Sequence, residues 1–155
     1  MDEALILETT FLVDLERERV QGKEGPAHRF LADNAGSRVY VTFTTAGELA
    51  AGPRLDEREA WERFLQPFRV LPWTLDVAWE YGRVYRHLAD DGRLIGANDL
   101  WIGATALANG MPLVTANEEH FRRIPRLRIR TYGKPVAPES RRKGPSRVAH
   151  RKPRR

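Results

Sequence analysis

The sequence predicts an α/β fold, with helices on both faces of a central, mainly parallel sheet of four to five strands. Two patterns predict this fold class. Short apolar segments rich in β-branched residues alternate along the chain with longer segments whose apolar residues recur at helical spacing. Strands that alternate with helices form βαβ units, in which the strands are parallel and the helices cover both faces of the sheet.

Five segments have the composition of strands. They cover residues 4–7, 38–42, 68–71, 112–115 and 126–130. The first is continuously apolar, as expected of a strand buried on both faces, and the second combines alternation with β-branched and aromatic residues. The last alternates around Leu127 and Ile129, and we expect it at the edge of the sheet.

Helical patterns fill the intervals between these strands. The expected helices are one after Thr9 or Thr10, then 27–34, 46–51, one after Asp56, 74–89, 99–109, and a helical turn at 118–121. Short polar side chains are favourable N-caps, so we expect caps at Thr9 or Thr10, Thr44 or Thr45, Asp56, and Asn98. Gly52 and Gly110 are placed to end their helices.

Charge divides the chain into two parts. The segment 134–155 contains nine Lys or Arg and one Glu, a net charge of +8, which leaves residues 1–133 at −3 of the chain's +5. The segment also holds four prolines and almost no large apolar residue, so burial cannot offset its ordering entropy. We therefore expect one domain over residues 1–133 and a disordered basic tail over residues 134–155. The tail either attracts RNA or only increases solubility.

The composition excludes several classes of protein. The absence of cysteine excludes disulfides, thiolate zinc sites and cysteine nucleophiles, so any metal must be bound by oxygen or imidazole. No apolar run approaches the roughly 20 residues needed to cross a bilayer. The apolar segment 4–7, behind an acidic start, is far shorter than that of a secretory signal. We expect a cytoplasmic protein that does not bind membranes.

Four polar residues lie near the carboxyl ends of predicted strands. Glu8 directly follows the first strand, and Asn117 follows the fourth. Glu48 lies one turn into the helix after the second strand, and Asp99 opens the helix before the fourth. In an open parallel sheet, the binding crevice lies outside the carboxyl ends of the strands. We therefore expect these four side chains to converge there.

Such a group of oxygen donors suits Mg²⁺ or Mn²⁺, which are hard cations that prefer carboxylate and water oxygens. We expect Glu8 and Asp99 to be metal ligands, and Glu48 to bind metal or to hold the nucleophilic water. Asn117 would position water or phosphate. A metal ion there would activate water for in-line attack on a phosphodiester and neutralise charge on the transferring phosphoryl group.

Three blocks of sequence carry a family resemblance. They are LILETTFLVDLER at 5–17, TFTTAGELAAG at 42–52, and IGANDLWIGATALANGMPLVTANEEHFRRIPRLRI at 95–129. The third block is the most specific, because Asp99 is followed by a Leu-Trp-Ile-Gly-Ala helix and by an apolar strand that ends in Thr-x-Asn. From about residue 4 to residue 129, the chain resembles the PIN-domain ribonucleases and, among them, the VapC-type toxins. The resemblance implies a PIN-like three-layer α/β/α fold.

The resemblance also implies a function. It implies a Mg²⁺- or Mn²⁺-dependent endoribonuclease toxin that cleaves structured cellular RNA, such as tRNA or rRNA, and leaves a 5′-phosphate. A cognate VapB-like antitoxin would cover the acidic site, and the catalytic domain would form a homodimer. By this resemblance, the family's three acidic positions fall on Glu8, Glu48 and Asp99, and its fourth polar position falls on Asn117. Glu8 is one methylene longer than the usual aspartate, and Asn117 is neutral where many members have aspartate.

Each candidate residue also has a plain structural interpretation. Asp99 is a favourable first-turn acid, worth about 0.3 to 1 kcal/mol through the helix dipole. Glu8 could be a solvated strand end, Glu48 a surface acid, and Asn117 a turn residue. We expect His120 to be structural or at the surface and not a metal ligand, and Asp14 to be an exposed helix acid. The tryptophans are expected in the core or in interfaces: Trp61, Trp73, Trp79 and Trp101.

One other function class stays open. A catalytically silent PIN fold could bind RNA or a protein partner, with the basic tail supplying the affinity, and the departures at Glu8 and Asn117 favour it. A phosphorelay receiver is excluded, because it needs an aspartate after the third strand and a lysine after the last. Residues 72–73 are Pro-Trp and residues 131–132 are Thr-Tyr.

Overall fold

The computed structural model describes residues 3–133. The predicted basic tail, residues 134–155, lies outside the described residues. The elements in chain order are β1 (Ala4–Leu7), α1 (Thr9–Gln21), α2 (Pro26–Asp33), β2 (Arg38–Thr42), α3 (Phe43–Ala51), α4 (Arg58–Leu65), β3 (Arg69–Leu71), α5 (Leu75–Asp90), α6 (Ala97–Asn109), β4 (Leu113–Val114), α7 (Glu118–Phe121) and β5 (Ile129–Arg130). Among the helices of this range, none is long and apolar enough to cross a membrane.

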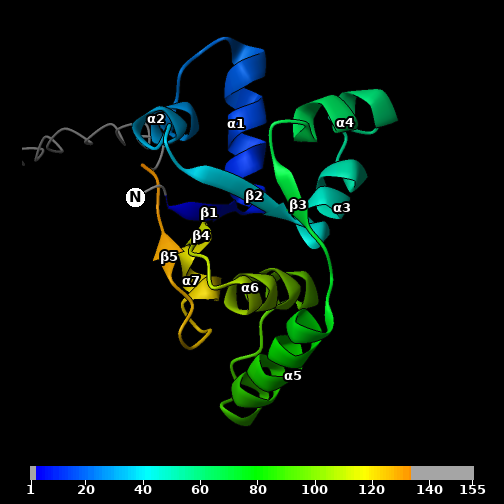
Figure 1. Ribbon diagram of the computed structural model, residues 1–155, viewed down its shortest axis with the longest axis vertical. Helices are drawn as coiled ribbons and strands as arrows, with labels where there is room; N and C mark the ends of the chain where they lie inside the picture. The colour runs from blue at the N-terminus through cyan, green and yellow to red at the C-terminus, as the bar shows by residue number, and fades with distance from the viewer. Residues whose placement is uncertain (1–2, 134–155) are drawn as a thin grey trace, which may run out of the picture.

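The five strands form one sheet in the order β3-β2-β1-β4-β5, and every pair is parallel. Helices α1 to α4 lie on one face of this sheet and α5 to α7 on the other (Figure 1). The predicted three-layer α/β/α fold is therefore confirmed, and β5 is an edge strand as expected. The chain moves outward from β1 through β2 and β3, and then returns to the other side of β1 with β4. This reversal makes the carboxyl end of β1 the switch point of the sheet.

The central strand β1 separates two hydrophobic cores. Leu5 and Leu7 pack into the core below α1 to α4, while Ile6 packs into the core shared with α5 to α7, and all three are fully buried. Alternate residues of a strand point to opposite faces, so the apolar run Ala-Leu-Ile-Leu supplies both cores at once. Burying each of these side chains contributes about 1.5–3 kcal/mol. The strand that leads into Glu8 is thereby firmly fixed.

A glycine brings α6 close to the segment that follows α7. A side chain at Gly103 would collide with Ile124 Cδ1 and would touch Leu127. Gly103 lies one helical turn after Asp99 and therefore on the same side of α6. The close approach at Gly103 thus places the start of α6 within reach of α7.

Four helix starts differ from the prediction. In α1 and α3 the capping side chain lies earlier in the chain than expected, and in α4 and α6 the N-cap residue makes no side-chain hydrogen bond to the helix. We expected Thr9 or Thr10 to cap the first helix, but the N-cap of α1 is Glu8, whose carboxylate accepts a hydrogen bond from Thr10 N at 3.0 Å. The other wrongly predicted caps were Thr44 or Thr45, Asp56 and Asn98, where the observed N-caps are Thr42, Glu57 and Gly96. The third, fourth and fifth strands are shorter than predicted: β3 and β5 begin later than their apolar patterns, and β4 is shorter at both ends, because pairing with the neighbouring strand covers only part of each pattern.

Candidate active site

Glu8 is the most buried of the four predicted site residues, with 3% of its surface exposed. Its Oε2 accepts hydrogen bonds from Thr10 N at 3.0 Å, Thr10 Oγ1 at 2.5 Å and Thr115 Oγ1 at 2.8 Å. Burial raises the pKa of the Glu8 carboxyl above its ordinary value, although these hydrogen bonds oppose the rise, and the charge of Asp99 adds to it. The carboxylate is therefore held through one oxygen in a site that already carries negative charge.

Two threonines join the end of β1 to the end of β4. Thr10 Oγ1 donates to Glu8 and accepts a hydrogen bond from Ala116 N at 3.0 Å. Thr115 Oγ1 donates to Glu8 and accepts one from Asn117 N at 2.9 Å. Asn117 is thereby fixed next to Glu8, as expected. The role of the two hydroxyls was missed, although Thr115 directly follows β4 and Thr10 lies only three residues after the end of β1.

Glu48 is held on the other side of β1 by Thr9. Thr9 Oγ1 donates to Glu48 Oε1 at 2.8 Å and lies 3.0 Å from Thr45 Oγ1. Since the Thr9 proton is used on Glu48, Thr45 must be the donor in the second contact. The adjacent residues Thr9 and Thr10, predicted only as alternative caps, thus orient one carboxylate each.

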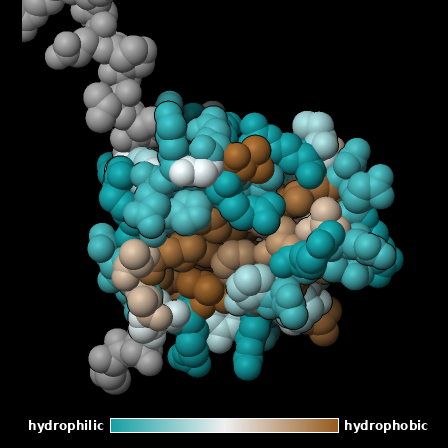
Figure 2. Space-filling model, turned by 90° about the horizontal axis from the view of Figure 1, so that it is seen from above, coloured by the Kyte–Doolittle hydropathy of each residue, from teal (hydrophilic) through white to brown (hydrophobic). Residues whose placement is uncertain are grey.

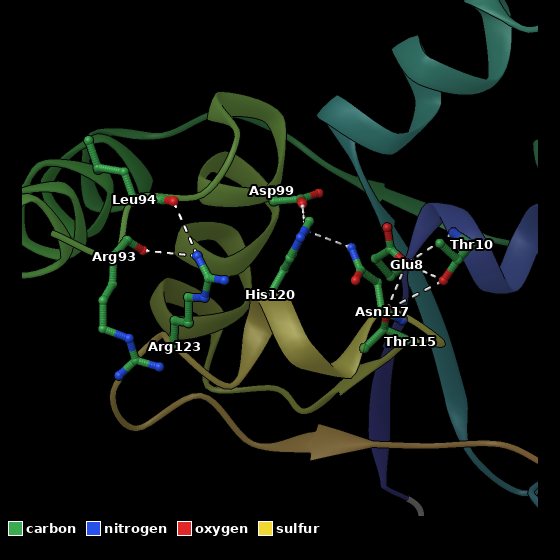
Figure 3. Close-up of polar contacts among 9 residues, drawn as sticks. All are labelled: Glu8, Thr10, Arg93, Leu94, Asp99, Thr115, Asn117, His120 and Arg123. Atoms are coloured by element: carbon green, nitrogen blue, oxygen red, sulfur yellow. Dashed lines mark hydrogen bonds and ion pairs between the residues drawn. The ribbon is translucent and has the colours of Figure 1, made fainter.

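Asp99 and Asn117 are connected through His120. His120 Nδ1 lies 3.1 Å from Asp99 Oδ2 and 3.0 Å from Asn117 Nδ2. Figure 3 shows Asp99, His120 and Asn117 in a row, with Glu8, Thr10 and Thr115 beyond Asn117. We expected His120 to be structural or at the surface. It is partly exposed, and it contacts two of the predicted site residues.

The four predicted residues converge at the carboxyl edge of the sheet, but they do not form a closed metal cage. Within residues 3–133, no three His, Asp or Glu side chains lie close enough together to form a metal-binding cluster on their own. Three carboxylates and one amide still fit a hard cation, because Mg²⁺ usually takes only one or two protein carboxylates and completes its shell with water and phosphate. The mutual repulsion of Glu8 and Asp99 is also what a cation would relieve.

A cavity opens directly beside Glu48. Its volume is about 220 Å³, and it lies between α1 and the end of α3, with Val13, Leu49 and Leu55 among its apolar lining residues. Figure 2 views the molecule from the side of α1, α2 and α4 and shows apolar side chains gathered in a hollow with hydrophilic side chains around it. Since Val13, Leu49 and Leu55 line the cavity together with Glu48, the surface next to Glu48 is partly apolar.

A second apolar surface lies on α5 and the start of α3. Trp73 stacks on Trp101, with ring centroids 4.6 Å apart, and also contacts Phe43 at 5.5 Å. On α5, Leu75 and Trp79 follow at helical spacing and are 89% and 66% exposed. Trp73 and Trp79 are thus not core residues. Of the two predicted locations, core or interface, only an interface stays a prediction for them.

Comparison with known proteins gives consistent matches. The sequence profile described as PIN domain matches residues 5–127. The chain is 34% identical over 127 residues to Ribonuclease VapC19 of Mycobacterium tuberculosis, which covers 79% of this chain and 95% of that protein. It is 28% identical over 135 residues to Ribonuclease VapC of Rickettsia bellii, which covers 82% and 95%. A solved structure of VapBC-5, a member of the VapBC family of toxin-antitoxin systems from Mycobacterium tuberculosis, matches with a TM-score of 0.56 and 25% identity, over 83% of this chain and 96% of that one.

Proposed function

The chain belongs to the PIN-domain family and, within it, to the VapC ribonucleases, and from this premise we propose that it is a metal-dependent endoribonuclease toxin. Its substrate would be structured cellular RNA, such as tRNA or rRNA, and it would act in the cytoplasm. One observation carries the proposal. Glu8, Asp99 and Asn117 lie together near the switch point of the sheet, and Glu48 is linked to this site by the hydrogen bond from Thr9, the residue next to Glu8.

The donor set of the site fits Mg²⁺ or Mn²⁺, and Glu8 and Asp99 would hold the ion. When bound, the ion supplies positive charge that stabilises the phosphodiester at the point of attack. Glu48, whose carboxylate accepts a hydrogen bond from Thr9, would accept the proton of the attacking water. Water forms the new bond to phosphorus, the bond from phosphorus to O3′ breaks, and solvent protonates O3′. The products are a 3′-hydroxyl and a 5′-phosphate, with Asn117 positioning the phosphate.

The test of this function should expose the protein to every RNA of a cell. We would induce the chain in a bacterial host, follow growth, and map new RNA 5′ ends. Growth arrest with a small set of discrete new 5′-phosphate ends is the expected result. Normal growth without new ends, in cells that contain folded protein, would contradict the proposal.

A VapB-like antitoxin is the partner that we propose for the cavity beside Glu48. The matched structure is a member of a toxin-antitoxin family, which supports a partner of this kind. An apolar segment seated against Val13, Leu49 and Leu55 would lie directly over Glu48 and block access to it. Binding of the antitoxin would then be sufficient to inhibit the nuclease.

We propose that the chain forms a homodimer through α5. Monomeric proteins rarely expose large contiguous apolar patches, and three large apolar side chains, Trp73, Leu75 and Trp79, are exposed within seven residues of the chain here. Leu75→Glu combined with Trp79→Glu is expected to weaken self-association by more than about 100-fold, as measured by light scattering over a concentration series. Val20→Glu is the control, because Val20 is also exposed, at 69%, but lies on α1. A wild-type protein that is monomeric, or a double variant that still dimerises, would contradict this interface.

The alternative function is a silent fold that binds RNA through its tail. The observation that favours it is the charge of +8 on residues 134–155, which lie beyond the residues matched by the PIN-domain profile. A chain truncated after residue 133 separates the two functions. A nuclease is expected to keep its cleavage sites and at least about a tenth of its rate, whereas a tail-dependent binder should lose its RNA affinity at physiological salt. RNA cleavage assays and filter binding at two salt concentrations would measure both quantities.

A further inference from the structure

The two predicted metal ligands are held by the protein in the same way. The hydrogen bonds that described residues make to the Glu8 side chain all go to Oε2, and the contact to the Asp99 side chain goes to Oδ2. In each carboxylate the second oxygen is left for a ligand. Carboxylates that bind metals are commonly fixed by such outer hydrogen bonds. His120 therefore contacts one oxygen of the Asp99 carboxylate, just as Thr10 and Thr115 contact one oxygen of the Glu8 carboxylate.

His120 is itself firmly placed. Its neighbour Phe121 is fully buried in the core beside α6, and Arg123 Nη1 donates to the carbonyl oxygens of Arg93 at 3.5 Å and Leu94 at 3.3 Å. Figure 3 shows this second attachment, which ties the segment after α7 to the loop that leads into α6. The short helix is thus fixed beside α6, which carries Asp99, and the backbone of His120 is held next to that carboxylate.

The proton on His120 decides which of its two contacts is formed. A carboxylate only accepts hydrogen bonds, so the contact to Asp99 requires a proton on Nδ1. An amide nitrogen only donates, so the contact to Asn117 Nδ2 requires a free lone pair on the same atom. The two bonds exclude each other. The bond to the charged carboxylate is the stronger one, and it should be the one formed.

We propose that His120 is a positioning residue whose Nδ1–H holds Asp99 Oδ2, so that Oδ1 is presented to the metal ion and Asn117 stays available for the phosphate. This inference rests on the metal site of the proposed function. It gives His120 no direct contact with metal or RNA. Its role is to fix the orientation of a carboxylate that would otherwise rotate about its side-chain bonds.

The tautomer of His120 is the first test, and it needs no metal. In a metal-free, ¹⁵N-labelled protein at about two pH units above the ordinary histidine pKa of about 6.5, two-bond proton–nitrogen correlations distinguish the Nδ1–H from the Nε2–H tautomer. We expect Nδ1–H at His120. His87 is an internal reference, because its Nε2 lies 3.5 Å from Asp91 Oδ2, and the opposite tautomer is expected there. An Nε2–H tautomer at His120 would overturn the proposal.

Metal affinity is the second test. His120→Ala should weaken Mn²⁺ binding about 10- to 100-fold, and RNA cleavage should fall with it. His120→Asn should restore both to within a few-fold of wild type, because its amide nitrogen occupies nearly the place of Nδ1. His120→Gln should not restore them, because its amide lies one carbon further out. His87→Ala, which removes a comparable histidine–aspartate contact on α5, should change neither quantity.

The outcomes separate this inference from the proposed function. If wild type binds Mn²⁺ and His120→Ala binds it equally well, the positioning role is wrong while the metal site stands. Equal losses in the Ala and Asn variants would also overturn it, since they would show that Nδ1 is not the atom that matters. A wild-type protein that binds no Mn²⁺ at all would overturn the proposed metal site, and the inference with it.

Discussion

Asp99→Asn should abolish RNA cleavage and growth arrest, with a loss of at least about 10²- to 10³-fold in the cleavage rate. The amide is nearly the same size as the carboxylate and can still accept a hydrogen bond from His120, but it lacks the charge that a divalent cation requires. Loss of the favourable helix dipole interaction costs only about 0.3 to 1 kcal/mol, so the variant should remain folded. The measurement is cleavage of total cellular RNA by purified protein with Mg²⁺ or Mn²⁺, read as new 5′ ends.

The matched control for this variant is Glu59→Gln. Glu59 is also an acid in the first turn of a helix, α4, and it is exposed. Its removal should cost the same dipole interaction and leave cleavage unchanged. Cleavage by Asp99→Asn at the wild-type rate, with the same 5′ ends, would show that Asp99 is a first-turn helix acid with no role in cleavage.

Glu8→Gln is expected to remove cleavage to a similar extent while making the protein more stable at neutral pH. The raised pKa of Glu8 means that the folded state binds a proton more tightly than the unfolded state, whose value is near 4.5. The resulting stability is fully present below the unfolded value and is lost as the pH rises through the folded value. Glutamine cannot ionise, so the variant should not lose stability over this interval.

The measurement is the free energy of unfolding by urea, for wild type and variant, from about pH 4 to pH 8 without metal. The stability of the variant relative to wild type should increase as the pH rises and then level off. Glu59→Gln again serves as the control, and its curve should run parallel to that of wild type. Parallel curves for Glu8→Gln and wild type over the whole range would contradict the physical cause given for the shift. Added Mn²⁺ should stabilise wild type more than the variant, because binding to the folded state alone adds to stability.

Much of the fold was predictable because apolar periodicity is a local property. The boundaries of β1 and β2 were predicted to the residue, and the strand alternation was enough to infer a parallel sheet with helices on both faces. Helix starts were less predictable. Thr9 and Thr10 look like better caps than Glu8 in isolation, and only the folded chain shows that both hydroxyls orient carboxylates while Glu8 itself caps α1.

The candidate site was predictable to the extent that it depends on topology. That Glu8, Glu48, Asp99 and Asn117 would share one edge followed from the rule that parallel strands end on the same side. The link through His120 did not follow, because it depends on how closely α6 approaches α7. That approach depends on the lack of a side chain at Gly103, which leaves room for Ile124, and no spacing in the sequence reveals this. The chemical roles of these residues remain predictions, and the variants above test them.

The position of β1 in the sheet has a consequence for how this protein is made. Its neighbours are β2, which follows soon after it, and β4, whose Leu113 pairs with Ile6 across more than a hundred residues of chain. Pairings of such long sequence separation form late, because a long loop must close before they yield any contact. On the ribosome, Glu8 is synthesised early and has no bond from Thr115 until β4 has emerged. A nascent or prematurely ended chain that lacks β4 therefore lacks part of the proposed nuclease site.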